Sequence, residues 1–234
     1  MSQFGFVRLD AHMADDLSVV NAARVSFAKS SDALDDSGIG LINFLMRERH
    51  GTPFEHNSFR FHIKCPIFVA REWFRHRIGS FNEFSARYSE VPNEFFTPNL
   101  EDVRKQIGKP GSYSFTPVDS ETANRAKEII DSINTTSYNA YNMLINIGIA
   151  KELARAVLPV STYTQFYWTV NARSLMNFLS LRNNSSAQKD IRDYAIEVEK
   201  IFSSIMPFTY EAWIRNERVA PDRKSTRLNS SHVS

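Results

Sequence analysis

Three consecutive basic residues, Arg75, His76 and Arg77, begin the densest group of chemistry-bearing side chains in this 234-residue sequence. An amide, a carboxylate, a hydroxyl and a fourth cation follow within ten residues: Asn82, Glu83, Ser85 and Arg87. A guanidinium group donates two parallel hydrogen bonds and keeps its charge, so converging arginines suit a phosphate group. Cations near a helix end can also complement the helix dipole, by about 0.3–1 kcal/mol each. The density of the downstream cluster favours an anion site.

Three further arginines are candidates for the same site. Arg155 lies in the apolar segment LARAVLP, where a buried cation needs a partner, and an ion pair within the chain is the alternative. Arg173 and Asn177 are four residues apart and share a face of a helix that Asn171 can cap. Arg182 points elsewhere. Taken alone, a solvated helix surface explains these helix residues better than a site does.

Several common active-site motifs are absent. Neither GxGxxG nor GxxxxGK[ST] occurs, so any dinucleotide must be held by side chains. GxSxG, HExxH and four-ligand zinc spacing are also missing, and no metal is expected. The single cysteine, Cys65, suits a small core residue. The segment HGTPFEH contains His50 and Thr52, but its Gly and Pro favour a turn with exposed polar groups.

The elements that would position these residues are mostly helices. Residues 57–65 alternate apolar and polar side chains, which predicts a half-buried strand. Pro66 suits the first position of a helix that runs through Arg77 to Gly79, and a polar loop follows. Further strands are predicted at 4–9 and 162–170, further helices at 15–24, 39–49, 122–148, 151–158, 172–182, 187–204 and 208–218, and a long excursion at 95–120. The strands are not spaced as regular βα units, so an α+β fold is expected.

Composition excludes several protein classes. The chain is 42% hydrophobic, 23% charged and 12% aromatic, which rules out disordered and fibrous proteins. No apolar run approaches the ~20 residues that a membrane helix needs, and the acidic start is unlike a signal peptide. A cytoplasmic protein is therefore expected.

The last thirteen residues differ in character from the rest. Residues 222–232, DRKSTRLNSSH, resemble a translated sequencing-library adapter, so we interpret 222–234 as a non-native tail after a single domain at 1–221. The tail holds all of the net charge of +2, and the body is formally neutral. A neutral body favours local anion sites over a broad polyanion-binding face.

Ordered blocks of sequence indicate a family. The RHR segment is separated from Ser85 by seven residues, and this RHRx7S pattern resembles the signature of the flavin-dependent thymidylate synthases. Similar family segments occur in the expected order: AARVSF (22–27), TPFEH (52–56), PIFVAREWFRHR (66–77), LARAVLP (153–159) and FYWTVNARSLMNFLSLR (166–182). The resemblance covers about residues 4–219.

The resemblance implies an architecture and a reaction. The architecture is a helix-rich α+β subunit with an antiparallel β-sheet, the thymidylate synthase-complementing protein fold, in a homotetramer with active sites between subunits. The reaction is methylation of dUMP to dTMP, with 5,10-methylenetetrahydrofolate as one-carbon donor and FAD, reduced by NADPH, as hydride source. Separate protomers would use different members of the RHR segment. Neither a nucleic acid nor a membrane is an expected partner.

The resemblance also implies roles for individual residues. FAD contacts are implied for Thr52, Arg75, His76, Arg77, Glu83, Asn171, Arg173 and Asn177, with His50 close to the flavin. Contacts with dUMP are implied for Arg75, Glu83, Ser85, Ala86, Arg87, Arg155 and Arg182, with Glu72 nearby. Catalytic roles are implied for Arg182, which would stabilise the uracil as N3 loses its proton, and for Ser85, a positioning hydroxyl without a base to activate it.

Three positions depart from the family pattern and leave alternatives open. Many relatives have Gln at Glu72, Gly at Ala86 and His at Ser186. A carboxylate at 72 would repel a phosphate unless it pairs with Arg75 or His76, so a protein that keeps FAD without turnover is one alternative. A module that grips single-stranded nucleic acid is another, and a structural helical assembly is a third. The neutral body counts against the nucleic-acid module, and the spacing of polar residues far from the RHR segment counts against both classes.

Overall fold

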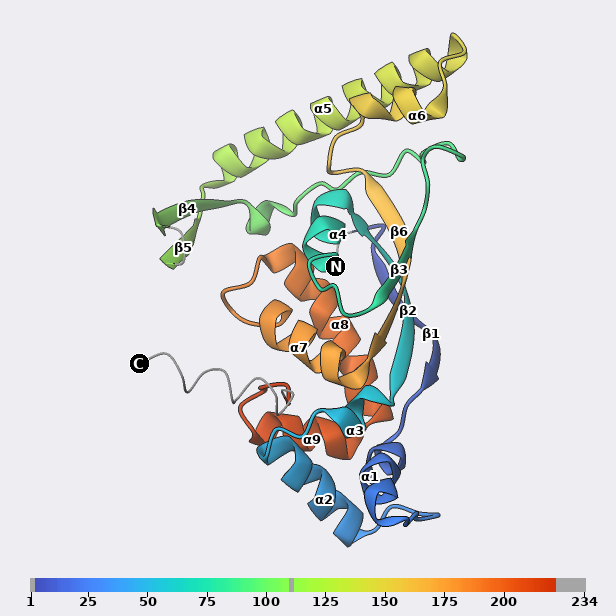
Figure 1. Ribbon diagram of the computed structural model, residues 1–234. Coiled ribbons are helices and arrows are strands. Elements are labelled where there is room, and N and C mark those ends of the chain that lie inside the picture. Colours follow the sequence, from blue (N-terminus) through green and yellow to red (C-terminus); the bar gives the residue numbers. More distant parts are fainter. Residues whose placement is uncertain (1–2, 110–111, 222–234) are drawn as a thin grey trace, which may run out of the picture.

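A four-stranded antiparallel sheet forms the centre of the computed structural model, which describes residues 3–109 and 112–221 (Figure 1). The interpreted tail at 222–234 lies outside these residues. The strands, in sheet order, are β1 (Phe6–Met13), β2 (Ser58–Pro66), β6 (Tyr163–Asn171) and β3 (Ser80–Glu83). Each neighbouring pair is antiparallel. The predicted α+β class and antiparallel sheet are confirmed.

The inner face of the sheet carries the core. In β2, the side chains of Phe59, Phe61, Ile63 and Cys65 are fully buried and alternate with more exposed polar ones, as the period of two predicts. Burial and the charge of Glu83 raise the pKa of the Cys65 thiol well above its ordinary value. Cys65 is therefore a neutral core residue, as expected from the sequence.

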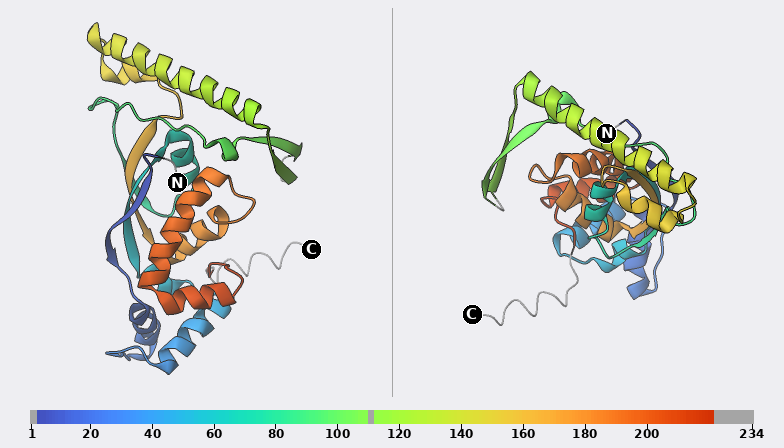
Figure 2. Two further views of the ribbon diagram at one scale, coloured as in Figure 1. Left: turned by 180° about the vertical axis from the view of Figure 1, so that it is seen from behind. Right: turned by 90° about the horizontal axis from the view of Figure 1, so that it is seen from above.

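Three helices cover this inner face: α4 (Ile67–Trp73), α7 (Ala172–Arg182) and α8 (Lys189–Ile205) (Figure 2). Trp73 stacks on Phe178 of α7 with ring centroids 4.7 Å apart and meets Trp168 of β6 edge-on at 5.3 Å. Asn171 caps α7 as predicted, because its side chain accepts a hydrogen bond from the Ser174 amide at 2.8 Å. The aromatic contacts fix α7 against the sheet.

The remaining helices lie at the two ends of the sheet. At one end lie α1 (Asp16–Arg24), α2 (Asp36–Arg47), α3 (Thr52–Glu55) and α9 (Pro207–Arg215). At the other, α5 (Ser120–Asn146) and α6 (Lys151–Ala154) form an arm, preceded by an exposed hairpin of β4 (Arg104–Lys109) and β5 (Ser112–Pro117). No helix among the described residues is long and apolar enough to cross a membrane.

Several sequence predictions of local structure are wrong. The helix after Pro66 ends at Trp73, so the RHR segment lies beyond it, and Pro66 is its N-cap. Phe74 ends the helix because its ring packs against Phe81 and Phe166, with centroids 5.0 Å away in each case.

Four further segments differ from their sequence-based predictions. The expected polar loop contains the edge strand β3, whose short polar sequence shows no period of two. The long excursion at 95–120 holds the β4–β5 hairpin, and the turn after His50 contains α3. The helix predicted at 151–158 is α6 followed by a 3-10 turn at Arg155–Val157. In each case tertiary pairing or packing determines the secondary structure of a segment whose local sequence pattern is weak.

Candidate active site

A cavity of about 1390 Å³ lies between α7, the segment after α4 and the C-terminal segment at 217–221. Six residues that the sequence assigned to the site line it: Arg75, His76, Arg77, Arg173, Asn177 and Arg182. Glu48, Arg49, Trp168, Ser180, Asn183 and Arg218 are among the other lining residues. The cavity therefore gathers cations from two segments a hundred residues apart.

Arg182, at the end of α7, is held by two residues from the other wall. Its Nε donates to His76 Nε2 at 2.9 Å, and its Nη1 lies 3.3 Å from Glu72 Oε2. Its Nη2 also donates to the Glu72 backbone carbonyl at 3.4 Å. Glu72 thus contacts Arg182 with both its side chain and its backbone, which fixes the plane of the guanidinium.

The protonation of this group follows from burial and charge. Burial, and then the charge of Arg182, lower the pKa of His76 to about 4, so the imidazole is neutral and Nε2 can accept the hydrogen bond. Burial raises the pKa of Glu72, partly opposed by Arg182 and reinforced by Asp190. Glu72 pairs with Arg182 instead of the Arg75 or His76 considered from sequence.

Two cations of the RHR segment stay uncommitted. Arg75 and Arg77 are exposed and line the cavity, and neither makes an ion pair or side-chain hydrogen bond within residues 3–109 and 112–221. His76 between them turns inward to Arg182 and packs edge-on against Phe178 at 4.9 Å. The segment begins in the turn that follows α4, and the surroundings of His76 differ from those of Arg75 and Arg77.

Arg49 is a cavity residue that the sequence reasoning missed. It follows α2 in the left-handed region, with φ of 61°, where glycine is usual. Its amide donates to the Met46 carbonyl at 3.2 Å and the His50 amide donates to Leu45 at 2.8 Å, the Schellman pattern of a helix end. Arg49 lines the cavity and has no ion pair among the described residues. No local pattern signals this position, because only the fold brings the end of α2 to the cavity.

Arg173 sits in a close-fitting cradle. Its Nε donates to the Pro221 carbonyl at 2.7 Å, and its Nη1 lies 3.6 Å from Glu55 of α3. A Cβ on Gly51 would come within 2.8 Å of Arg173 Nε and 3.0 Å of the Pro221 oxygen. Gly51 is therefore required for this close approach, and its neighbours His50 and Thr52 do not line the cavity.

The other predicted residues form a second group at the arm end of the molecule. Glu83 accepts a hydrogen bond from Thr164 Oγ1 at 2.7 Å, and Ser85 lies in the turn that follows. Ala86 packs against the small core of Tyr141, Val91 and Ala154.

The two arginines of this second group make only local contacts. Arg87 Nη2 donates to the hydroxyl of its neighbour Tyr88 at 3.1 Å, and Arg155 Nε donates to the Glu152 carbonyl at 3.3 Å. Both are exposed, and neither has an ion pair in the described part of the chain. None of Glu83, Ser85, Ala86, Arg87 or Arg155 lines the cavity. One chain therefore presents the predicted site residues in two separate groups.

The cavity suits an anionic cofactor that is held by side chains. Arg75, Arg77 and Arg49 form no ion pair with another described residue, so their charges are available to an anion, whereas His76 is neutral. No glycine-rich phosphate loop is present in the sequence. The chain is therefore an α+β protein whose cavity has the chemistry to hold an anionic group through arginine side chains and not through a backbone cradle.

Comparisons with known proteins define the family. Residues 8–208 match the family described as thymidylate synthase complementing protein, and the chain belongs to this family. It is 49% identical over 211 residues to a flavin-dependent thymidylate synthase of Thermosipho africanus (strain TCF52B), covering 90% of this chain and 91% of that protein. It is 44% identical over 226 residues to the enzyme of that description from Tropheryma whipplei (strain TW08/27), with 92% and 94% coverage.

A solved structure agrees with these relatives. A UMP/dUMP methylase, PolB from Streptomyces cacaoi bound with 5-Br UMP, superposes with a TM-score of 0.87 at 42% identity, over 94% of this chain and 98% of that one. The sequence-based expectation of an enzyme of the flavin-dependent thymidylate synthase class, which methylates dUMP to dTMP, is confirmed.

Proposed function

We propose that the cavity is the flavin side of a dUMP-methylating active site, with FAD contacts from Arg75, His76, Arg77, Arg173 and Asn177. The observation that carries this proposal is the pair of uncommitted guanidinium groups, Arg75 and Arg77, beside the fixed group of Arg182, His76 and Glu72. FAD brings a diphosphate, which two unpaired arginines can bind bidentately. Thr52, His50 and Asn171 complete this side from the cradle of Arg173.

Arg182 is the residue on which the chemistry depends. Uracil C5 must become nucleophilic, and a guanidinium that keeps its proton stabilises negative charge spread over N3 and the carbonyl oxygens. Glu72 and neutral His76 hold that guanidinium in one orientation before the substrate arrives, so no reorganisation is needed at the reacting ring. In the assembled site the folate supplies the one-carbon unit, and FAD, reduced by NADPH, supplies the hydride.

Glu72 suits the role of a positioning residue better than that of a ligand. Its carboxylate lies 3.3 Å from Arg182, so its charge is compensated and does not face an incoming phosphate alone. The Gln of many relatives could make a similar hydrogen bond to Arg182. This pairing removes the main reason to expect a protein that keeps FAD but cannot turn over.

The second group completes the site from another subunit. In this proposal Glu83, Ser85, Ala86, Arg87 and Arg155 bind dUMP in a homotetramer whose active sites lie between chains, and Ser85 positions the nucleotide. Two observations support it: Arg87 and Arg155 are exposed without charge partners in the described residues, and the α5 side chains Ile129, Ile133 and Met143 are more than half exposed. Exposed apolar side chains on one helix are typical of an interface.

The test is a visible absorption spectrum of residues 1–221, saturated with FAD, desalted, and recorded before and after addition of dUMP. A retained flavin band that dUMP perturbs, together with dTMP formation when folate and NADPH are added, is the expected result. UMP is added in a parallel sample to test whether the site distinguishes the two sugars, because one similar protein is described as a UMP/dUMP methylase. A folded protein that retains no flavin would refute the assignment of the cavity. Binding of single-stranded nucleic acid in its place would support the module considered above.

A further inference from the structure

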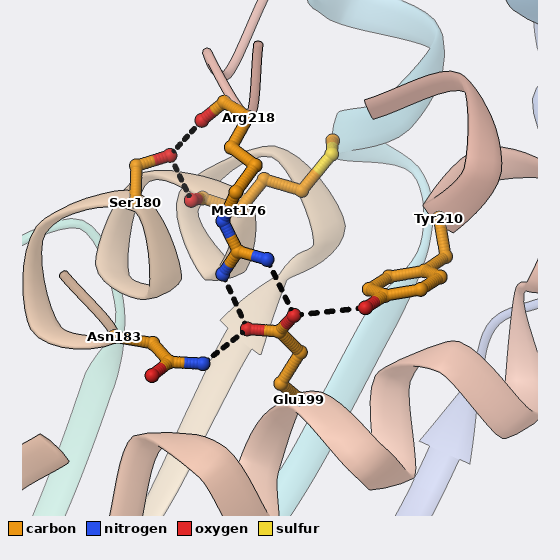
Figure 3. Close-up of polar contacts among 6 residues, drawn as sticks. All are labelled: Met176, Ser180, Asn183, Glu199, Tyr210 and Arg218. Carbon is orange, nitrogen blue, oxygen red and sulfur yellow. Dashed lines mark hydrogen bonds and ion pairs between the residues drawn. The ribbon is translucent and has the colours of Figure 1, made fainter. Parts of the chain in front are cut away.

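Glu199 on α8 joins two separate walls of the cavity, and no step of the proposed reaction uses it (Figure 3). Its carboxylate accepts both arms of the Arg218 fork, from Nη1 at 2.7 Å and Nη2 at 2.5 Å. It also accepts from Asn183 Nδ2 at 2.8 Å and from the Tyr210 hydroxyl at 2.9 Å. With four donors, and with only 10% of its side chain exposed, the carboxylate has no capacity left for a ligand.

The first wall is the end of α7. Asn183 follows Arg182 directly, and both line the cavity. The Asn183 amide closes the helix on the Leu179 carbonyl at 2.9 Å, and its side chain is tied to Glu199. The position of Arg182 along the cavity therefore depends on a contact behind it, in addition to the contacts with Glu72 and His76 in front.

The second wall is the segment at 217–221. Glu217 and Arg218 both have left-handed backbones, with φ of 60° and 56°, which non-glycine residues adopt only where their surroundings hold them. The Arg218 guanidinium lies 4.3 Å from the Trp213 ring centroid, and its carbonyl accepts a hydrogen bond from the Ser180 hydroxyl. Three residues on, the Pro221 carbonyl binds Arg173.

The charge of Glu199 supports this arrangement. Burial acts to raise its pKa, but hydrogen bonds from Arg218 and Asn183 outweigh burial and hold the pKa below its ordinary value. The carboxylate is thus ionised and matched to one arginine. Removing one member of such a buried pair leaves the other charge uncompensated, so a change at Glu199 is transmitted to Arg218.

We propose that Glu199 is a positioning residue of the active site, which fixes Arg182 relative to the segment that holds Arg173 by binding Asn183 and Arg218 with one carboxylate. The inference rests on the proposed function, since it assigns the two walls to the reacting nucleotide and to FAD. A carboxylate on α8 then sets the width of a cavity that it does not enter.

The test compares Glu199→Gln with Glu197→Gln, a control on the same helix whose carboxylate pairs with Lys200 at the surface, 2.8 Å away. Amide hydrogen exchange of the ligand-free proteins is expected to accelerate in both walls, at 183–185 and 216–220, in Glu199→Gln only. In the folded variant we expect the FAD dissociation constant to rise and kcat to fall by about tenfold each, with KM for dUMP changed less than either. Arg218→Lys, which keeps the charge but loses the fork, is expected to lie between wild type and Glu199→Gln.

Other outcomes are decisive as well. Unchanged exchange in either wall would overturn the inference, whether or not flavin binds, because the two walls would not be held by Glu199. Accelerated exchange with unaltered FAD affinity and kcat would reduce Glu199 to a structural residue and also overturn it. If Glu199→Gln fails to fold, Arg218→Lys decides by the same readouts. Failure of the proposed function is a different result, since wild type itself would then retain no flavin.

Discussion

The two groups of predicted site residues differ in the partners that their arginine side chains find within the chain. In the cavity, Arg182 and Arg173 are held by partners from distant segments, and their guanidinium groups have fixed positions. At the arm, Arg87 and Arg155 contact only residues within three positions of themselves and face solvent. Arg182 and Arg173 are thus pre-organised within one chain, whereas Arg75 and Arg77 of the same group have no such partners among the described residues. At the arm, no hydrogen bond from a distant segment orients the Arg87 or Arg155 side chain among the described residues.

The largest expected effect comes from removing one arginine in each half. Arg182→Ala should lower the rate of dTMP formation by about 10²–10³-fold, because a fixed donor to the developing charge is lost. Arg155→Ala should also impair turnover, through weaker dUMP binding. Retained FAD absorbance reports that the cavity is intact, and Arg215→Ala, which removes an exposed pair with Glu211, is the control.

Co-expression of these two variants tests whether the cavity and the arm act together across subunits. If the halves come from different subunits, mixed oligomers of Arg182→Ala and Arg155→Ala chains contain some sites with neither defect, and measurable activity returns. Activity that stays at the level of the separate variants would show that each chain builds its site alone, and the contrast between the halves would lose its meaning.

A smaller effect is expected at the cradle of Arg173. Gly51→Ala places a methyl group within 2.8 Å of Arg173 Nε, and such overpacking typically costs about 1–3 kcal/mol. We expect a lower urea midpoint and weaker FAD binding. Gly40→Ala, inside α2 where an added Cβ meets no atom within 4 Å, should leave FAD binding unchanged and raise the urea midpoint, because Ala favours a helix interior over Gly by about 0.5–1 kcal/mol. Equal effects of the two substitutions would contradict a special role for residue 51.

The pH dependence of stability should reveal His76. Its pKa is about 4 in the folded state, against an ordinary value of 6.5 in the unfolded chain, so the unfolded chain takes up the proton first as pH falls. The contribution of neutral His76 to the free energy of unfolding is present in full above pH 6.5 and is lost as pH falls towards 4. The loss is about 1–2 kcal/mol, because solvent screens a partly exposed group.

The measurement is urea unfolding of wild type and His76→Gln at several values of pH between 7 and 4. The difference in unfolding free energy between the two proteins should shrink as pH falls. Glu72, whose pKa is raised, acts in the opposite direction and is present in both proteins, so the comparison isolates the change at His76 and its coupling to Glu72 through Arg182. A difference that stays constant with pH would mean that His76 is not held neutral by its site.

The smallest effect is expected at Arg49. Arg49→Gly relieves a left-handed backbone and should stabilise the protein by about 1 kcal/mol. Because the substitution removes an unpaired cation from the cavity, it should also weaken FAD binding slightly. Calorimetry measures the expected gain in stability, and a flavin titration measures the expected loss of FAD affinity. A loss of stability would show that the Arg49 side chain stabilises the fold by more than its left-handed backbone destabilises it.

Local patterns predicted the parts of this molecule that are decided locally. The alternation in β2 and the capping amide of Asn171 specify structure over a few residues, and both predictions are confirmed. The end of α4 depends on Phe74 meeting Phe166, ninety residues away, and β3 becomes a strand only because β6 pairs with it. Pairing of Glu72 with Arg182 likewise spans 110 residues, so no spacing in the sequence signals it.

Site residues were predicted through the family blocks, and the cavity brings together only part of them. Arg75, Arg77 and Asn177 line it as a group, whereas Ser85 and Arg87 lie at the arm. The resemblance to the family singled out these side chains, but their distribution over the molecule follows from the fold.

The buried indole of Trp168 forms part of the cavity wall, with Trp73 only 5.3 Å away. Tryptophan emission overlaps flavin absorption, so a flavin bound in this cavity would quench the pair by energy transfer. The chain thus carries its own optical reporter of cofactor loading, and binding kinetics could be followed by stopped-flow fluorescence without a label or an engineered residue.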